Sequence, residues 1–240
     1  MMKKLVLAGM IALSIASCDV LKTVATDVLA IPTTTEAAGG LKDALSQGFS
    51  NGVTNLSTRG AFGKNPLIKI LLPPDAQKIA DKLTAIGFGP QVENVITKLN
   101  EGAENAVATA KPVFISAVKD MTFNDAMGIL TGGKGAATNY LKQTTTTQLT
   151  TLFRPKIQES LDQIGVTKNW ADLVTKYNSI PLVTKLNPDL NGFVTEKALA
   201  ALFNKVEEEE NLIRENPLLR STELMKKAFN YADSKKTTTP

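Results

Sequence analysis

The sequence contains no histidine, and its only cysteine is Cys18. Without imidazole, the chain cannot build a serine–histidine triad, a histidine general base or a histidine metal site. Aromatic residues make up only 5% of the chain, with one tryptophan and three tyrosines, so few rings could stack on a ligand. These absences lower the expectation of an enzyme. We expect no catalytic residues, no cofactor and no metal site.

Neither sign of charge dominates. Lysine and arginine together number 27 and aspartate and glutamate 23, which gives a formal net charge of +4. A nucleic-acid-binding domain normally has a strongly basic face, so we expect no nucleic-acid partner. After the N-terminus, no apolar run reaches the roughly 20 residues that a membrane-spanning helix needs.

The first 18 residues have the pattern of a secretory signal. Lys3 and Lys4 precede a short apolar run, and the small residues Ala16 and Ser17 come directly before Cys18. This order is typical of a signal peptide with a small-residue cleavage site, and the cysteine after it resembles a bacterial lipoprotein box. We expect cleavage after residue 17 and acylation of Cys18 with palmitate-like chains. A plain secreted protein or an uncleaved anchor are the alternatives.

Lipidation at Cys18 would place the protein on a membrane. Each buried methylene contributes about 0.8 kcal/mol, so two or three acyl chains give durable anchoring. The thiol would then be consumed, which excludes a disulfide or thiolate site. We expect a location in the Gram-negative cell envelope, on the outer membrane facing the periplasm. Asp19 resembles an inner-membrane retention signal of enteric bacteria and keeps the inner membrane as an alternative.

Composition divides the mature chain into three parts. Residues 18–40 contain Pro32, a run of threonines and two glycines, which is typical of a tether. We expect a single helical domain over residues 41–232. The polar residues 233–240 are expected to form a disordered tail.

Hydrophobic residues recur at spacings of three and four along most of the domain, which indicates helices. The sequence therefore predicts an all-α, bundle-like domain of about nine or ten helices. Thr122 with Asp125 resembles a capping box, and Asn216 before Pro217 resembles an N-cap. The best strand candidate, residues 67–72, is flanked by Pro66, Pro73 and Pro74, so we expect an extended crossing segment there.

A run of four glutamates interrupts the apolar stripe of the helix that contains Val206 and Ile213. Glu209 and Glu210 lie one turn from these residues, so at least one carboxylate should point toward the apolar side. A buried charge must be matched, and Arg214 lies one turn after Glu210. The candidate polar site has these members: Glu209, Glu210, Arg214, Arg154 and Tyr140. A structural ion-pair network is the alternative.

The stretch from Thr131 to Thr138 resembles a phosphate-binding loop because it contains three glycines and a lysine. It lacks the Gly-Lys-Ser/Thr order of that motif, and its surroundings are helical. An ordinary turn between helices explains the same residues. Anion binding at the start of the following helix is the alternative.

Several motifs occur in a characteristic order between Leu41 and Phe229. They are Asn65–Pro74, Lys111–Phe114, Met121–Ala126, Ala136–Tyr140, Lys197–Phe203 and Glu208–Pro217. Together they resemble domain-of-unknown-function family 4197, a bacterial envelope family that often has a lipoprotein signal. The resemblance implies an all-helical domain. It implies no activity or catalytic residue.

These patterns favour a membrane-anchored binding or assembly module without catalysis. Its partners would be the membrane, through acyl chains on Cys18, and a hydrophobic ligand, peptide or envelope protein in a groove between helices. One alternative is an envelope enzyme that uses Glu209 or Glu210 as a base beside Arg214 and Arg154, with Tyr140 nearby. Another is a purely structural spacer, which would have no apolar concave pocket.

Overall fold

The computed structural model describes residues 31–165, 170, 175, 178, 179, 181, 182, 185, 187 and 189–236. These residues form helices, turns and irregular segments and no strand, which confirms the all-α class. None of the described helices is long and apolar enough to cross a bilayer. Cys18 and the signal peptide lie outside the described residues, so acylation stays a prediction.

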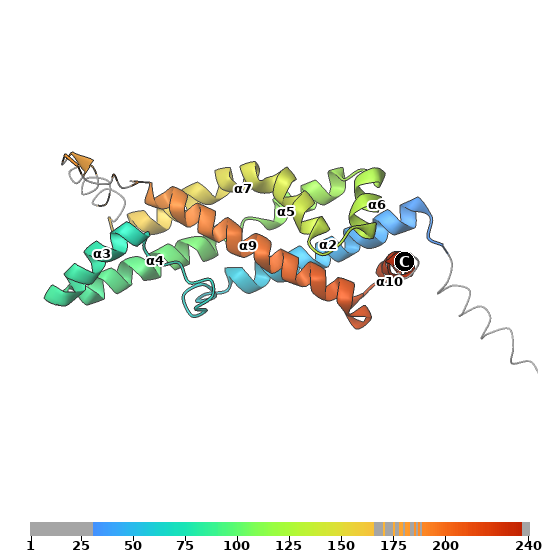
Figure 1. The fold of residues 1–240 in the computed structure, drawn as a ribbon, viewed down its shortest axis with the longest axis horizontal. Coiled ribbons are helices and arrows are strands. Elements are labelled where there is room, and N and C mark those ends of the chain that lie inside the picture. Colours follow the sequence, from blue (N-terminus) through green and yellow to red (C-terminus); the bar gives the residue numbers. More distant parts are fainter. Residues whose placement is uncertain are drawn as a thin grey trace, which may run out of the picture.

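Three long helices dominate the fold: α2 (Thr34–Ser57), α7 (Ala136–Asp162) and α9 (Leu190–Glu215). Figure 1 shows α9 running along the molecule between α7 and α2, and it contacts both. The shorter helices pack around these three. They are α3 (Pro74–Leu83), α4 (Gly89–Val107), α5 (Lys111–Asp120), α6 (Phe123–Thr131) and α10 (Glu223–Lys236), with a π-helical segment η1 (Thr84–Phe88) and a 3-10 segment η2 (Pro217–Leu219).

One hydrophobic core connects these helices. At its centre the rings of Phe49 on α2, Phe114 on α5 and Phe203 on α9 are all buried. The Phe49 and Phe114 centroids lie 5.5 Å apart, and those of Phe114 and Phe203 lie 6.1 Å apart. These tilted and edge-on geometries suit aromatic pairs.

The expected tether is wrong in its C-terminal part, because α2 begins at Thr34 and not at Leu41. Thr33 and Glu36 form a complete capping box that starts the helix. Gly39 and Gly40 are helical, and Gly40 is buried where α10 crosses α2. The glycine pair therefore permits close helix packing, whereas the composition suggested a flexible linker.

The expected boundary at residue 232 is also too early. Helix α10 continues to Lys236, and the Asp233 carboxylate accepts a hydrogen bond from Arg220 at 2.8 Å. The described residues also form fewer helices than the nine or ten expected, because α2, α7 and α9 are each unbroken over 24 to 27 residues. The capping box at Thr122 is confirmed, and Asn216 caps η2.

The contact of Gly40 with α10 leaves no room for a side chain. A Cβ added at Gly40 would lie 2.7 Å from the Ala228 Cβ and would also clash with the Leu224 carbonyl oxygen. At Gly39 the nearest such atom is the flexible tip of the Leu224 side chain, at 3.4 Å. The two adjacent glycines therefore form a matched pair for a test.

We predict that Gly40→Ala lowers the free energy of unfolding by about 2 kcal/mol or more, because the two helices must separate. Gly39→Ala should be neutral or stabilise by up to about 1 kcal/mol, because alanine favours helix. Urea unfolding followed by circular dichroism measures both. Equal effects of the two substitutions would contradict the close helix contact.

The lowered pKa of Glu36 predicts that the stability of the protein depends on pH. Hydrogen bonds from Lys227 on α10 and from Thr33 lower the pKa of Glu36 from 4.5 to about 2. A carboxylate whose pKa falls on folding stabilises the protein above its unfolded pKa, and this contribution is lost as the pH falls to the folded pKa. The stability difference between the wild type and Glu36→Gln should therefore be constant above about pH 5 and shrink toward pH 2. A difference that stays unchanged over this range would contradict the prediction; denaturant titrations at several pH values measure it.

Candidate functional site

The glutamate run does place one carboxylate in the interior. Glu210 is buried, and its carboxylate accepts hydrogen bonds from the backbone N–H groups of Ala137 and Thr138, at 3.0 and 2.8 Å. It also accepts from the Thr138 hydroxyl at 2.8 Å and from Arg214 Nε at 2.8 Å. Glu210 thus provides, from another helix, the N-terminal cap that α7 lacks in its own sequence.

This cap occupies the place at which the phosphate-like loop, Thr131 to Thr138, could bind an anion. The stretch ends in the first turn of α7, and its N–H groups at Ala137 and Thr138 could have held a phosphate. They instead hold the Glu210 carboxylate. Gly135, with φ +72°, makes the turn that leads into the helix.

Arg214 performs the complementary task at the end of α6. Its guanidinium donates to the carbonyl oxygens of Ile129, at 2.8 Å, and of Leu130 and Gly132, each at 3.3 Å. A cation is favourable at a helix C-terminus, where the last carbonyl groups have no helical partner. The Glu210–Arg214 pair therefore joins the end of α6 and the start of α7 to α9.

A second buried arginine, Arg220, is not predicted by the sequence pattern. It donates to the carbonyl oxygens of Ile213 and Arg214 at the end of α9, and to Asn230 and Asp233 on α10. The Phe229 ring lies 5.3 Å from its guanidinium carbon and 5.8 Å from that of Arg214, within cation–π range. A lone arginine after a proline turn gives little sign of burial, so sequence reasoning had no signal for it.

The Glu209 side chain contacts different residues from those that the Glu210 side chain contacts. Its carboxylate accepts a hydrogen bond from Asn51 on α2 at 3.1 Å and pairs with Lys205 at 3.3 Å. Partial burial lowers the pKa of Lys205, but the hydrogen bonds to Glu208 and Glu209 outweigh it and raise that pKa overall. Glu209 is thus part of a link between α9 and α2.

Arg154 and Tyr140 do not join the cluster. Arg154 pairs with Asp189 at 2.9 Å, and Asp189 caps α9 at its N-terminal end, about six turns from Glu210. The Tyr140 hydroxyl donates to the Ala117 carbonyl oxygen of α5 at 3.4 Å. The expected grouping with Arg154 and Tyr140 is therefore wrong. Helical spacing shows which residues share a face but not which neighbouring helix that face meets.

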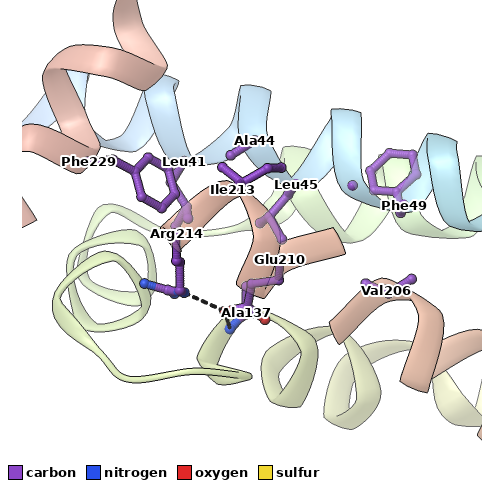
Figure 2. Close-up of a pocket in the computed structure, with 11 residues that line it drawn as sticks. Leu41, Ala44, Leu45, Phe49, Ala137, Val206, Glu210, Ile213, Arg214 and Phe229 are labelled. Carbon is purple, nitrogen blue, oxygen red and sulfur yellow. Dashed lines mark hydrogen bonds and ion pairs between the residues drawn. The ribbon is translucent and has the colours of Figure 1, made fainter. Parts of the chain in front are cut away.

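The space beside the Glu210–Arg214 pair is small. Figure 2 shows the two side chains at the edge of an apolar hollow formed by Leu41, Ala44 and Leu45 of α2 and by Phe229. Its volume is about 10 Å³, which is room for one water molecule at most. The cluster is therefore built to hold helices together and has no space for a substrate. In the described part of the chain, no group of three or more histidine, cysteine, aspartate or glutamate residues could hold a metal ion.

A larger hollow lies at the other end of α9. We call it the α9 groove; it has a volume of about 380 Å³. One wall is the irregular segment 67–73, the last part of the connection from α2 to α3, together with Pro74 at the start of α3, and the other is the N-terminal half of α9. The described lining residues are Leu67, Ile68, Lys69, Ile70, Leu71, Leu72, Pro74, Phe193, Lys197, Ala200, Ala201 and Asn204.

Two side chains of α4 hold the segment wall and the turn that precedes it in place. The buried Asn100 amide accepts from the Ile70 N–H and donates to the Ile70 carbonyl oxygen, both at 2.8 Å. One turn later, the buried Glu104 carboxylate accepts from the N–H groups of Gly60 and Phe62, both at 3.0 Å. The wall is therefore fixed at Ile70 by a pair of hydrogen bonds, and the turn before it is fixed by charge-assisted hydrogen bonds.

The buried Glu210–Arg214 pair predicts a loss of stability when one of its two charges is removed. Glu210→Gln should lower the free energy of unfolding by about 3 kcal/mol, because it leaves the Arg214 charge buried without a counter-charge. The control is Glu208→Gln, since Glu208 is an exposed partner of Lys205. It should change the free energy by less than about 1 kcal/mol. Denaturant unfolding compares them, and an equally small effect of both variants would contradict the structural role.

The comparisons with known proteins give a family and no activity. The model of a family described as "Protein of unknown function (DUF4197)" matches residues 32–230. No curated protein and no solved structure matches the chain. The match covers most of the chain, including α2 to α9, the Glu210 cluster and both walls of the α9 groove. The chain therefore belongs to the DUF4197 family.

Proposed function

We propose that this protein is a lipid-anchored, non-catalytic binding module of the Gram-negative envelope, and that the α9 groove is its binding surface. The observation that carries the proposal is the groove itself. It is an open hollow of about 380 Å³ whose described lining is mostly apolar, with Lys69, Lys197 and Asn204 as the polar side chains. Ligand sites in proteins commonly combine these properties at a volume of roughly 300–1,000 Å³.

The groove also leaves large apolar side chains in contact with solvent. Leu67 is 91% exposed and Leu71 is 50% exposed on the segment wall. Apolar groups gathered at a concave surface favour association with a partner. This argues against the spacer alternative, because a spacer does not need an apolar hollow.

The enzyme alternative depends on a free carboxylate beside arginine and tyrosine. The Glu210 carboxylate instead accepts four hydrogen bonds from α7 and Arg214. Arg154 and Tyr140, which would assist it, contact other helices. The arrangement of these groups therefore supports a structural use of the cluster, and we assign binding to the α9 groove.

The anchor part of the proposal rests on the pattern that ends at Cys18. An acylated N-terminus on the outer membrane would hold the helical domain on the periplasmic side. Cells labelled with radioactive palmitate should incorporate label into the wild type and none into Cys18→Ser. Label in both proteins, or in neither, would contradict acylation at this residue.

A plug variant tests the groove. Ala200 lines the groove and is exposed, so Ala200→Trp should fill the space without disturbing the core. The domain without residues 1–18 should bind the apolar dye 1-N-phenylnaphthylamine, and Ala200→Trp should weaken this binding at least about tenfold, equivalent to about 1.4 kcal/mol. The control is Gln148→Trp, at an exposed position on α7 outside the groove lining. Absent dye binding, or equal binding by both variants, would contradict the proposed function.

A further inference from the structure

The segment wall of the α9 groove presents main-chain hydrogen-bonding groups as well as apolar side chains. Ile70 is paired on both sides with Asn100. Among the hydrogen bonds of the described residues, none uses the N–H group or the carbonyl oxygen of Leu71. In an extended segment the main-chain groups of successive residues point to opposite sides, so those of Leu71 point away from Asn100. Each non-proline residue has one strong donor and one strong acceptor that require a partner when a ligand excludes water.

The charges at the groove have one sign. Of the described lining residues, only Lys69 and Lys197 are charged, and they lie on opposite walls. Within the described part of the chain, neither lysine forms an ion pair; the Lys197 Nζ lies 5.5 Å above the Phe193 ring. Two cations around an apolar hollow complement a ligand that combines apolar groups with negative charge.

We infer that the α9 groove binds an extended peptide segment that alternates apolar and acidic residues, with its main chain paired to Leu71 and its carboxylates near Lys69 and Lys197. This inference rests on the proposed function and specifies its ligand. In an extended peptide, alternate side chains point to opposite faces. Apolar residues can then face the groove floor while acidic residues point toward the rim.

An acyl chain fits these observations less well. It matches the apolar floor, and a fatty acid also carries a carboxylate. It has no main-chain donors or acceptors, however, so it would cover the Leu71 groups without pairing them, which is unfavourable. Adding a strand-like peptide to a free main-chain edge satisfies such groups and is a common mode of peptide recognition.

The length of the segment wall sets the length of the peptides used as probes. Residues 69–73 can span at most about 17 Å, at about 3.4 Å per residue, so the test peptide needs about six residues. The first probe alternates valine and glutamate. The second alternates valine and lysine, and the third is the glutamate peptide with N-methylated backbone nitrogens. Sodium palmitate is the fourth probe.

The experiment measures displacement of 1-N-phenylnaphthylamine from the domain at low salt. The glutamate peptide should displace the dye at a concentration at least about tenfold lower than the lysine peptide, the N-methylated peptide or palmitate. The double variant Lys69→Gln/Lys197→Gln should still bind the dye but lose most of the preference for the glutamate peptide. Lys142→Gln, an exposed lysine of α7, is the control and should keep the preference.

The outcomes separate the inference from the proposed function. Dye binding with stronger displacement by palmitate, or with equal displacement by the two charged peptides, would overturn the peptide inference and leave the groove as an apolar site. Equal displacement by the N-methylated and unmodified glutamate peptides would overturn the main-chain pairing. Failure of the dye itself to bind would overturn the proposed function, and the inference with it.

Discussion

The buried pair Glu210–Arg214 is the interaction on which the arrangement of the long helices depends. Two ionised groups in the interior are unfavourable unless their hydrogen bonds are completed. Here the carboxylate is completed by the N-terminus of α7 and the guanidinium by the C-terminus of α6. Each helix end, in turn, has polar groups that need a partner. The pair and the helix ends therefore satisfy one another, and this fixes α9 relative to α6 and α7.

Fixing α9 also determines the groove at its other end. Phe193, Lys197 and Ala200 belong to the same unbroken helix as Glu210, so their positions follow from the position of that helix. The opposite wall has no such support from secondary structure and relies on Asn100 of α4, while Glu104 of α4 holds the turn that precedes the wall. Helix α4 itself packs against α7 and α9. The buried polar residues thus act as positioning groups for both walls, although none of them lines the α9 groove.

The features that the sequence predicted correctly are the local ones. The all-α class, the Thr122 capping box and the pairing of Glu210 with Arg214 all follow from residues three or four apart. The errors concern contacts between distant segments. Arg154 lies on the same helix as Tyr140 but forms an ion pair with Asp189. Gly40 resembles part of a linker in the sequence, whereas in the structure α10 crosses α2 at this residue. Asn100 and Arg220 were missed because their partners are backbone groups, whose positions depend on the fold and not on nearby side chains.

A physical distinction separates the Glu210 cluster from the α9 groove. At the Glu210 cluster, every strong hydrogen-bonding group meets a partner within the chain, and the adjacent space holds one water molecule at most. At the α9 groove, apolar side chains, main-chain groups and two lysines remain available beside a space large enough for a ligand. Completed polar networks stabilise and specify a fold, whereas recognition needs groups whose interactions are still to be made. Charged residues in an apolar stripe therefore located the structural centre of the fold, and the proposed binding surface includes a proline-bounded segment that has no conspicuous chemistry in the sequence.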